Sequence, residues 1–330
     1  MDTRLNIMVD LYKNKTFCLI GDSIMEHGFY TYNLRAYFQN STDKCYFYNR
    51  GVAGNRAIMA QYLLDDDVFW TEPDYAVICF GANDMGVWLY DSLIPVTDEI
   101  LSDRKKRDDE YILAHQILID KLKEKGIKPI IMSPYCVDEF ITETEDVQTV
   151  TDNEEKEVLR PSFYKRKTFQ NINEGFKGYT KRLKELAEKN DVIFWDMFSA
   201  TYETMLTTRG LYFADGIHYS KDSGHALLAN IILGFLGCDG AKSFEKTADN
   251  DKVFELEQFE RSVGYISRCT PMNAHFGAHT EKDVIDHAEK VLADSNTYER
   301  GRICAENYLK HHHELDDIKQ RLKQAVKSLY

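Results

Sequence analysis

The chain contains 330 residues with a formal net charge of −13, and 43% of its residues are hydrophobic and 12% aromatic. That length predicts about two domains, and the composition is that of a chain with a large buried core rather than a disordered one. The acidic balance argues against binding to nucleic acid or to an anionic membrane surface. No apolar run reaches the roughly 20 residues that a membrane-spanning helix needs.

The cysteines and the N-terminal residues indicate the cellular setting. The seven cysteines are scattered and form no Cys-x-x-Cys pair, which disfavours a zinc ribbon or a disulfide framework. Residues 1–17 are interrupted by charges and lack the apolar core of a signal peptide. We therefore expect a soluble, cytoplasmic globular protein.

Short apolar or β-branched runs alternate with helical patterns over the first two-thirds of the chain. Strands are predicted at residues 16–20, 45–48, 75–80, 129–132 and 192–195. Helices are predicted near residues 111–122, 169–186 and 224–236. Five strands that alternate with helices predict a doubly wound α/β fold with a mostly parallel sheet. Ligands of such sheets bind at the carboxyl ends of the strands, so the loops that follow the strands are the candidate site.

Two segments depart from this alternation. Residues 138–157 are rich in Asp and Glu, which favours a solvated surface insertion and leaves open a lid beside the site. Residues 240–330 show helical patterns and no convincing strand, so we expect an α/β domain at 1–239 and a helical extension at 240–330. Apolar positions of the extension, such as Ile318 and Leu322, need cover from the α/β domain or from another subunit. A homo-oligomer, or a partner bound through these helices, therefore remains open.

Four short segments lie next to predicted strands or helices. They are Gly21-Asp22-Ser23-Ile24, Asn49-Arg50-Gly51-Val52-Ala53-Gly54-Asn55, Phe80-Gly81-Ala82-Asn83-Asp84 and Asp215-Gly216-Ile217-His218. Each segment alone is typical of an ordinary turn, and the second lacks the Gly-x-Gly-x-x-Gly spacing of a dinucleotide-binding loop. Together they supply one candidate for each role in acyl transfer by a serine.

Acyl transfer by a serine needs an activated hydroxyl, a base held by a partner, and donors for the negative charge on the acyl oxygen. Ser23 follows the first strand on a glycine-led turn that suits an exposed hydroxyl. His218 is the candidate base, and the carboxylate of Asp215, three residues earlier, can reach its Nδ1 atom. Gly54 offers a backbone N–H that no Cβ shields, and Asn83 offers a side-chain amide.

This set of motifs resembles the SGNH (GDSL-type) hydrolase superfamily, whose four blocks carry Ser, Gly, Asn and His. The matching residues are Ser23, Gly54, Asn83 and His218, with Asp215 in the Asp-x-x-His block, and the resemblance covers about residues 14–237. It implies a flavodoxin-like three-layer α/β/α fold and a Ser-His-Asp mechanism without a metal or an organic cofactor. It also implies an oxyanion hole made by the Ser23 N–H, the Gly54 N–H and the Asn83 amide. Ile24 stands where the GDSL subgroup has leucine, which is a volume-conserving change.

Several further residues near the strand ends have roles that the sequence leaves open. Three residues that flank Gly54 serve either substrate contact or salt bridges, namely Arg50, Asn55 and Arg56. The aromatic residues that form either pocket walls or plain packing are Trp88, Tyr90 and Tyr135. His27 is a candidate pocket residue, and His225 is expected to be structural.

The leading hypothesis is a serine esterase that hydrolyses a small acyl ester, acetyl first, on a carbohydrate. One alternative is a carbohydrate O-acetyltransferase that uses the same residues, with a sugar hydroxyl in place of water. Another is a non-catalytic binding or scaffold protein that uses the helical extension. Because all four segments precede residue 219, the sequence assigns no catalytic part to the extension.

Overall fold

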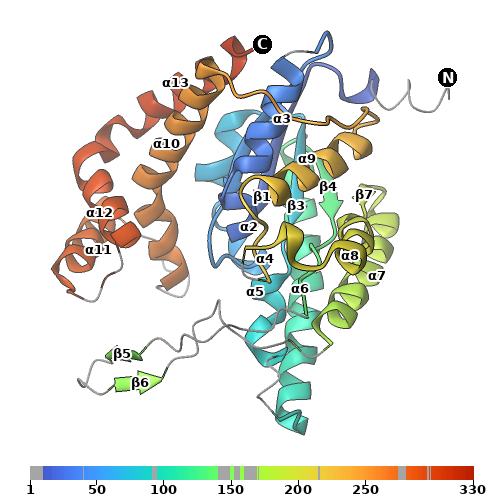
Figure 1. Ribbon diagram of the computed structural model, residues 1–330. Helices are drawn as coiled ribbons and strands as arrows, with labels where there is room; N and C mark the ends of the chain where they lie inside the picture. Colours follow the sequence, from blue (N-terminus) through green and yellow to red (C-terminus); the bar gives the residue numbers. More distant parts are fainter. Residues whose placement is uncertain are drawn as a thin grey trace.

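The computed structural model describes residues 10–39, 41–90, 95–139, 149–151, 157–159, 169, 171–214, 216–273, 280–295, 297 and 299–330. Figure 1 shows two parts, a central sheet with helices around it and a group of C-terminal helices beside one edge of the sheet. Within the described residues, no helix is both long enough and apolar enough to cross a membrane.

A five-stranded parallel sheet forms the centre of the fold, as predicted. Its strands are β1 (Lys15–Gly21), β2 (Cys45–Gly51), β3 (Tyr75–Cys79), β4 (Lys128–Met132) and β7 (Ile193–Trp195). Their order is β2-β1-β3-β4-β7, and every neighbouring pair is parallel. The strand order reverses at β1, so the carboxyl ends of β1, β2 and β3 meet at the switch point where doubly wound proteins bind ligands.

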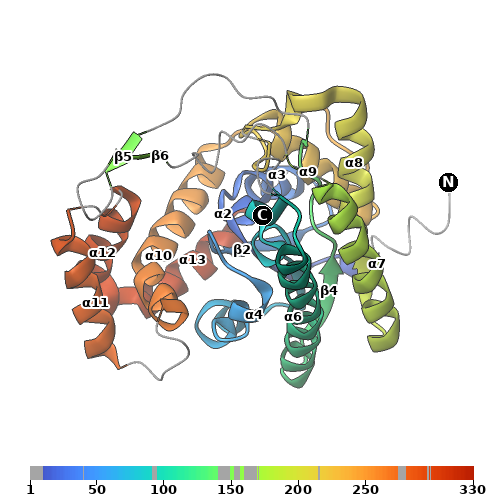
Figure 2. The same cartoon turned by 90° about the horizontal axis from the view of Figure 1, so that it is seen from below.

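Helices cover both faces of the sheet, which gives the predicted three-layer α/β/α arrangement. The helices of this α/β region are α2 (Ser23–Glu26), α3 (Phe29–Gln39), α4 (Ala57–Ala60), α5 (Ala82–Met85), α6 (Asp98–Glu124), α7 (Ile172–Asn190), α8 (Met197–Thr208) and α9 (Ser223–Phe235). Figure 2 shows α3 and α9 on one side of the sheet and α4 and α6 on the other. Short π or 3-10 segments lie at Leu64–Val68, Phe69–Thr71, Val87–Tyr90, Arg209–Tyr212 and His312–Glu314.

Residues 240–330 form the predicted helical extension, with α10 (Ala248–Asn273), α11 (Glu281–Ala293), α12 (Glu299–His311) and α13 (Leu315–Ser328). The apolar faces of α10 and α13 pack on the β2 edge in a cluster of Tyr48, Val253, Leu322, Val326 and Leu329. The α/β region therefore covers these two faces itself. A second, smaller core lies among α10, α11 and α12, with Ile266, Val284, Ala288, Cys304, Ala305 and Tyr308 buried.

Buried ion pairs also join the extension to the sheet. Arg35 on α3 donates to Glu257 on α10 at 2.7 Å, and Arg50 at the end of β2 donates to Glu260 at 2.6 Å. All four side chains are fully buried. Burial would lower the pKa of Arg50, but the carboxylates of Glu260, Asp67 and Glu257 outweigh it and hold that pKa above its usual value. Loss of one partner would leave an unpaired charge in the protein interior, which would destabilise the fold.

The acidic segment differs in part from the prediction of a solvated insertion. Asp138 is buried, and its N–H donates to the Gly216 carbonyl at 2.8 Å. The segment therefore begins inside the fold rather than at its surface. Further along, β5 (Thr149–Thr151) and β6 (Glu157–Leu159) pair antiparallel. The remainder of residues 140–156 lies outside the described residues, and so does the hypothesis of a lid.

Candidate active site

The candidate nucleophile, Ser23, is the first residue of α2, directly after β1. Asp22 caps that helix, because its Oδ1 accepts from the Ile24 N–H at 3.1 Å. Position 21 requires a glycine because β3 passes close to it, and a Cβ there would lie 2.6 Å from the Cys79 carbonyl oxygen. The strand and the cap together place the Ser23 hydroxyl at the carboxyl edge of the sheet.

The candidate base lies within hydrogen-bond distance of this hydroxyl. Ser23 Oγ and His218 Nε2 are 2.9 Å apart, although 195 positions separate them in the sequence. The loop that carries His218 is held by a hydrogen bond from the Ala214 N–H to the His218 carbonyl at 2.7 Å. The His218 side chain is largely buried. Asp215, the predicted partner of His218, lies outside the described residues.

The second motif forms the loop after β2 and lies beside the first. The Val52 N–H donates to the Gly21 carbonyl at 2.9 Å, and a Cβ on Gly51 would lie 2.4 Å from the Glu26 nitrogen. Gly54 has a φ of 75°, which glycine adopts far more readily than other residues. An ideal Cβ at Gly54 meets no atom within 4 Å, so the space in front of its backbone is open.

Hydrogen bonds join the third motif to the loop of the second motif and to α4, which follows it. Asn83 Nδ2 donates to the Asn55 carbonyl at 3.1 Å, and Asp84 Oδ1 accepts from the Ala57 N–H at 2.8 Å. Burial raises the pKa of Asp84 to about 7, although the Ala57 N–H and the charge of Arg56 lower it. These two bonds fix the Asn83 amide relative to the loop that carries Gly54.

Asp22 is close to the reacting groups, but its contacts are those of a helix cap. Burial raises the pKa of Asp22 to about 6, against the opposing effects of the Ile24 N–H and the nearby His218. Its Oδ1 atom is engaged by the Ile24 N–H. Asp22 therefore fixes the turn that carries Ser23.

The three polar residues that flank Gly54, whose roles the sequence leaves open, contact other protein groups. Arg50 is buried by its ion pairs and by the ring of Trp70, 5.1 Å from the guanidinium carbon, so it serves the interior and not a substrate. Arg56 pairs with Glu110, and Asn55 is buried, with its Oδ1 accepting from the Arg56 N–H at 3.0 Å.

The two candidate wall residues that the structure describes, Tyr90 and Tyr135, are both buried, and Tyr135 borders a small cavity of about 10 Å³. Tyr90 is buried under the Arg104 guanidinium, 3.9 Å from its ring centre. Tyr135 is buried, and its hydroxyl lies 3.4 Å from that of Tyr30. The side chain of Trp88 lies outside the described residues.

His27 is exposed and stands beside the candidate base. Its ring centre is 5.3 Å from that of His218 and 5.9 Å from that of His225. His225 is buried, its Nδ1 accepts from the Tyr30 N–H at 3.2 Å, and burial lowers its pKa to about 3. His225 therefore acts as a neutral structural side chain, as expected.

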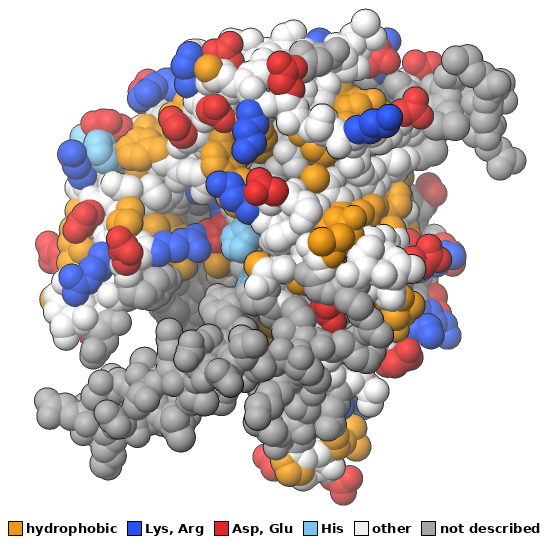
Figure 3. All heavy atoms as spheres, viewed as in Figure 1, with side chains coloured by type: hydrophobic (Ala, Val, Ile, Leu, Met, Phe, Trp, Pro, Cys, Tyr) orange, Lys and Arg blue, Asp and Glu red, His pale blue; other side chains and the backbone are white. Residues whose placement is uncertain are grey.

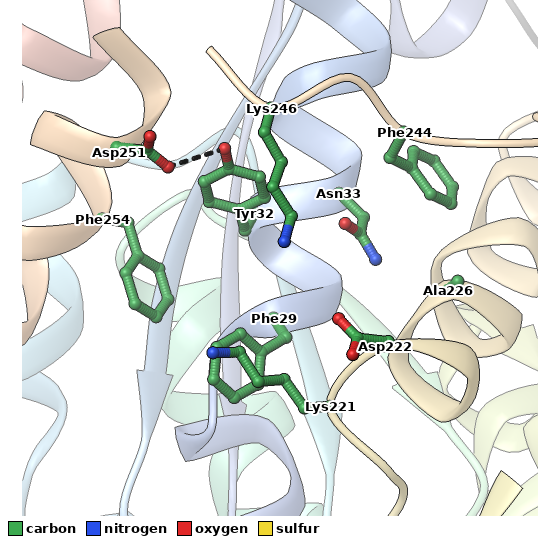
Figure 4. A pocket seen from close by; sticks show the side chains of 10 residues that line it. All are labelled: Phe29, Tyr32, Asn33, Lys221, Asp222, Ala226, Phe244, Lys246, Asp251 and Phe254. Atoms are coloured by element: carbon green, nitrogen blue, oxygen red, sulfur yellow. Dashed lines mark hydrogen bonds between the residues drawn. The ribbon is translucent and has the colours of Figure 1, made fainter. Parts of the chain in front are cut away.

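A cavity of about 370 Å³ opens on the far side of His225, between α3, the start of α9 and α10. Phe29 forms part of its wall and connects it to His225. The Phe29 ring meets the His225 ring edge-on with 5.5 Å between ring centres, and it stacks on Phe254 with 5.6 Å between ring centres. Figure 4 shows Lys246, Asn33 and Asp222 pointing into this space, with Tyr32 bonded to Asp251. Figure 3 shows charged side chains of both signs over this junction.

No pattern in the sequence indicates this cavity. Phe254 and Lys246 belong to the extension, and Lys221 lies over the Phe29 ring with its ammonium 4.8 Å from the ring centre. No short motif joins these residues, since they are brought together by the packing of α9 and α10 against α3.

Comparison with known proteins identifies the family. The model of the GDSL-like lipase/acylhydrolase family matches residues 19–227, which include all four motifs. The chain belongs to this family. It is therefore an SGNH-type carboxylic ester hydrolase, and the three-layer fold described above agrees with that membership.

Solved structures show the same fold. BT4096, described as a gut microbial diltiazem-metabolizing enzyme, is 14% identical with a TM-score of 0.65, and the match covers 96% of each chain. A mutant of Axe2, an acetyl-xylooligosaccharide esterase from Geobacillus, is 21% identical with a TM-score of 0.50 and covers 70% of this chain and 98% of its own. Comparison with curated protein sequences gave no significant match. The first of these structures thus spans the helical extension as well as the α/β region.

Proposed function

We propose that this esterase is a serine enzyme in which Ser23 is the nucleophile, His218 the general base and Asp215 the partner that orients His218. We propose further that it removes a small acyl group, acetyl first, from an esterified carbohydrate. The observation that carries the proposal is the 2.9 Å separation of Ser23 Oγ and His218 Nε2 at the switch point of the sheet.

Acylation begins when Ser23 Oγ attacks the ester carbonyl carbon and its proton passes to His218 Nε2. The negative charge that develops on the carbonyl oxygen is stabilised by the N–H groups of Ser23 and Gly54 and by the Asn83 amide. His218 then gives its proton to the leaving alcohol oxygen as the carbon–oxygen bond breaks. The acyl group remains on Ser23 as an ester.

Deacylation repeats these steps with water. His218 takes a proton from water as the water oxygen attacks the acyl carbon, and then returns that proton to Ser23 Oγ as the acid departs. Only the identity of the second nucleophile separates hydrolysis from transfer to a sugar hydroxyl, which would use the same groups.

Two observations support a carbohydrate as the alcohol part of the ester. The cavity on the far side of His225 combines aromatic surface with carboxylate, amide and ammonium groups, a mixture that suits a polar ring compound. Its volume of about 370 Å³ is in the range of small-molecule sites. The Axe2 structure, of similar fold, is described as acting on acetylated xylo-oligosaccharides.

The test is an assay of the purified full-length protein on aryl esters of increasing acyl length and on acetylated xylo-oligosaccharides. We expect the highest kcat/KM for acetyl, and a loss of turnover by roughly 10⁶-fold in Ser23→Ala with the fold retained. Ser199→Ala, at an exposed position of α8, is the matched control and should keep full activity. A folded Ser23→Ala that keeps more than a few per cent of the turnover would remove Ser23 from the mechanism.

A second set of reactions includes an acetyl donor and a free sugar acceptor. Release of free acetate at a rate that the acceptor does not change supports hydrolysis. Transfer of the acetyl group to the sugar in preference to water would replace the hydrolase proposal with an acetyltransferase that uses the same residues.

A further inference from the structure

Glu26 connects the helix of the nucleophile to the loop of the oxyanion donor. It is the last residue of α2, three positions after Ser23, and it is buried. Its Oε2 accepts from the Ala53 N–H at 2.9 Å. Ala53 directly precedes Gly54, so this carboxylate holds the loop one residue away from the proposed oxyanion donor.

Two arginines from the helical extension converge on the other oxygen of the same carboxylate. Arg261 of α10 lies 3.0 Å from Glu26 Oε1, and Arg300 of α12 pairs with the same oxygen. These side chains come from helices that lie more than two hundred positions along the chain from Glu26.

Arg261 also binds the backbone on both sides of the junction. Its Nη1 donates to the Glu26 carbonyl at 2.8 Å and its Nη2 to the Gly51 carbonyl at 2.6 Å. One guanidinium therefore holds the end of α2 and the start of the loop that carries Gly54. A planar fork of fixed donors suits such a task better than a single ammonium group.

The arrangement has a catalytic consequence if the donors of the oxyanion hole act as proposed. Such donors stabilise the transition state only when they are already aimed at the position of the oxyanion. At the tip of the loop 51–54, Gly54 is exposed, whereas Val52 behind it is buried and bonded to the Gly21 carbonyl. Glu26 and Arg261 bind the same loop from behind, at the Ala53 N–H and the Gly51 carbonyl, and so help to set the position of Gly54.

We propose that Glu26, held by Arg261 and Arg300, is a positioning residue for the oxyanion loop, so that the helical extension completes the active site from a distance. This inference rests on the proposed function, since it assumes the roles of Ser23 and Gly54. Both carboxylate oxygens of Glu26 are engaged by donors, so it takes no proton from substrate or water.

The experiment compares Glu26→Ala, Glu26→Gln and Arg300→Gln in the full chain, with an aryl acetate as substrate. We expect kcat to fall by about 10²-fold in Glu26→Ala, because displacement of a catalytic group by about 1 Å costs that much, while KM changes little. Glu26→Gln keeps an acceptor for the Ala53 N–H, so it should retain more of kcat than Glu26→Ala. Arg300 is partly exposed, so Arg300→Gln should fold and show a smaller loss of kcat.

Glu72→Gln is the matched control. Glu72 pairs with Lys323 of α13 at 2.7 Å, so this variant also breaks an ion pair between the α/β region and the extension. It lies away from the loop and its carboxylate is exposed, so kcat should stay at the wild-type value. The single variant Arg261→Ala is measured as well. The double variant Glu26→Ala/Arg261→Ala should lose no more kcat than the more impaired of Glu26→Ala and Arg261→Ala, because both side chains act on one loop.

All rates are taken per active site, counted by reaction of Ser23 with a fluorophosphonate. A role in stability alone would lower the melting temperature and leave kcat per labelled site unchanged, and this result in both Glu26→Gln and Arg300→Gln would overturn the inference. If Glu26→Ala does not fold, these two variants decide. If the wild-type protein is not labelled at Ser23, the proposed function fails instead, so the two failures are distinguishable.

Discussion

Asn83 has both a structural and a proposed catalytic role in the candidate site. Its amide nitrogen donates to the Asn55 carbonyl at 3.1 Å, which leaves its second N–H for a developing oxyanion. The side chain therefore joins two motifs and supplies a proposed donor at the same time. Its sequence position after β3 predicts the second duty and gives no sign of the first.

Asn83→Ala should lower kcat by roughly 10²–10³-fold, as the loss of one oxyanion donor does in other hydrolases, with a small change in KM. The measurement is steady-state kinetics on an aryl acetate. Asn190→Ala is the control, because that amide bonds Gln116 near the opposite edge of the sheet. An Asn83→Ala variant in which KM alone changes would show that Asn83 binds the substrate and does not stabilise the transition state.

His225 makes the stability of the fold depend on pH. Burial, with smaller effects from His27 and His218, lowers its pKa from 6.5 to about 3. Between these two values the unfolded chain binds a proton at this position and the folded chain does not. The stability that depends on a neutral His225 is therefore fully present above about pH 6.5, and it is lost as the pH falls toward about 3.

The corresponding experiment measures the free energy of unfolding of the wild type and of His225→Phe between pH 4 and pH 7. Acidification should cost the wild type more than the variant, because the variant has no imidazole to charge on unfolding. Asp22 and Asp84, whose pKa values are raised, act in the opposite direction and are present in both proteins. Equal losses in the two proteins would contradict the neutral, buried assignment of His225.

Helix α10 joins the helical extension to the α/β region through buried ion pairs and hydrogen bonds. Glu257 of this helix accepts from Arg35 at 2.7 Å and from the Asn49 N–H at 2.9 Å, and it lies 3.6 Å from Arg50. The carboxylate therefore binds α3 and β2 to the extension at once. The apolar spacing of residues 248–273 indicates a helix, but not that its buried side includes two glutamates.

Glu257→Ala should destabilise the protein by about 3–5 kcal/mol, because it leaves buried guanidinium groups without their partner. Asp249→Asn at the start of the same helix breaks an exposed pair with Lys252 and should cost less than about 1 kcal/mol. Urea unfolding of both variants gives the comparison. A Glu257→Ala variant as stable as Asp249→Asn would show that the buried network adds nothing to stability.

The elements that the sequence predicts best are those with a strong hydrophobic period. The five strands agree with the predicted ones to within a few residues, because each is a short buried run that ends in a turn. Helix α6 begins at Asp98, well before the predicted residue 111, since its first turns are exposed and carry no apolar pattern. The strands β5 and β6 lie in an acidic segment with no strand signal, and were not predicted.

Across the whole molecule, short sequence motifs can be recognised from the sequence, whereas contacts between distant segments cannot. The motifs around Ser23, Gly54, Asn83 and His218 indicate the family because each is a short run at a strand end. The contacts of Glu26 with Arg261 and Arg300 come from three separate helices, and no single stretch of sequence contains them. Helices α10 and α13 pack on the α/β region, so the extension is part of the fold, while the predicted domain boundary near residue 239 stays a prediction.

The central claim, that Ser23 is the activated nucleophile, is tested most directly by chemical labelling of the full chain with a fluorophosphonate, followed by peptide mapping. We predict loss of esterase activity in step with the attachment of one label per chain, located on Ser23 and absent from Ser23→Ala. Complete loss of activity with the label on another residue, or undiminished activity after exhaustive treatment, would contradict it.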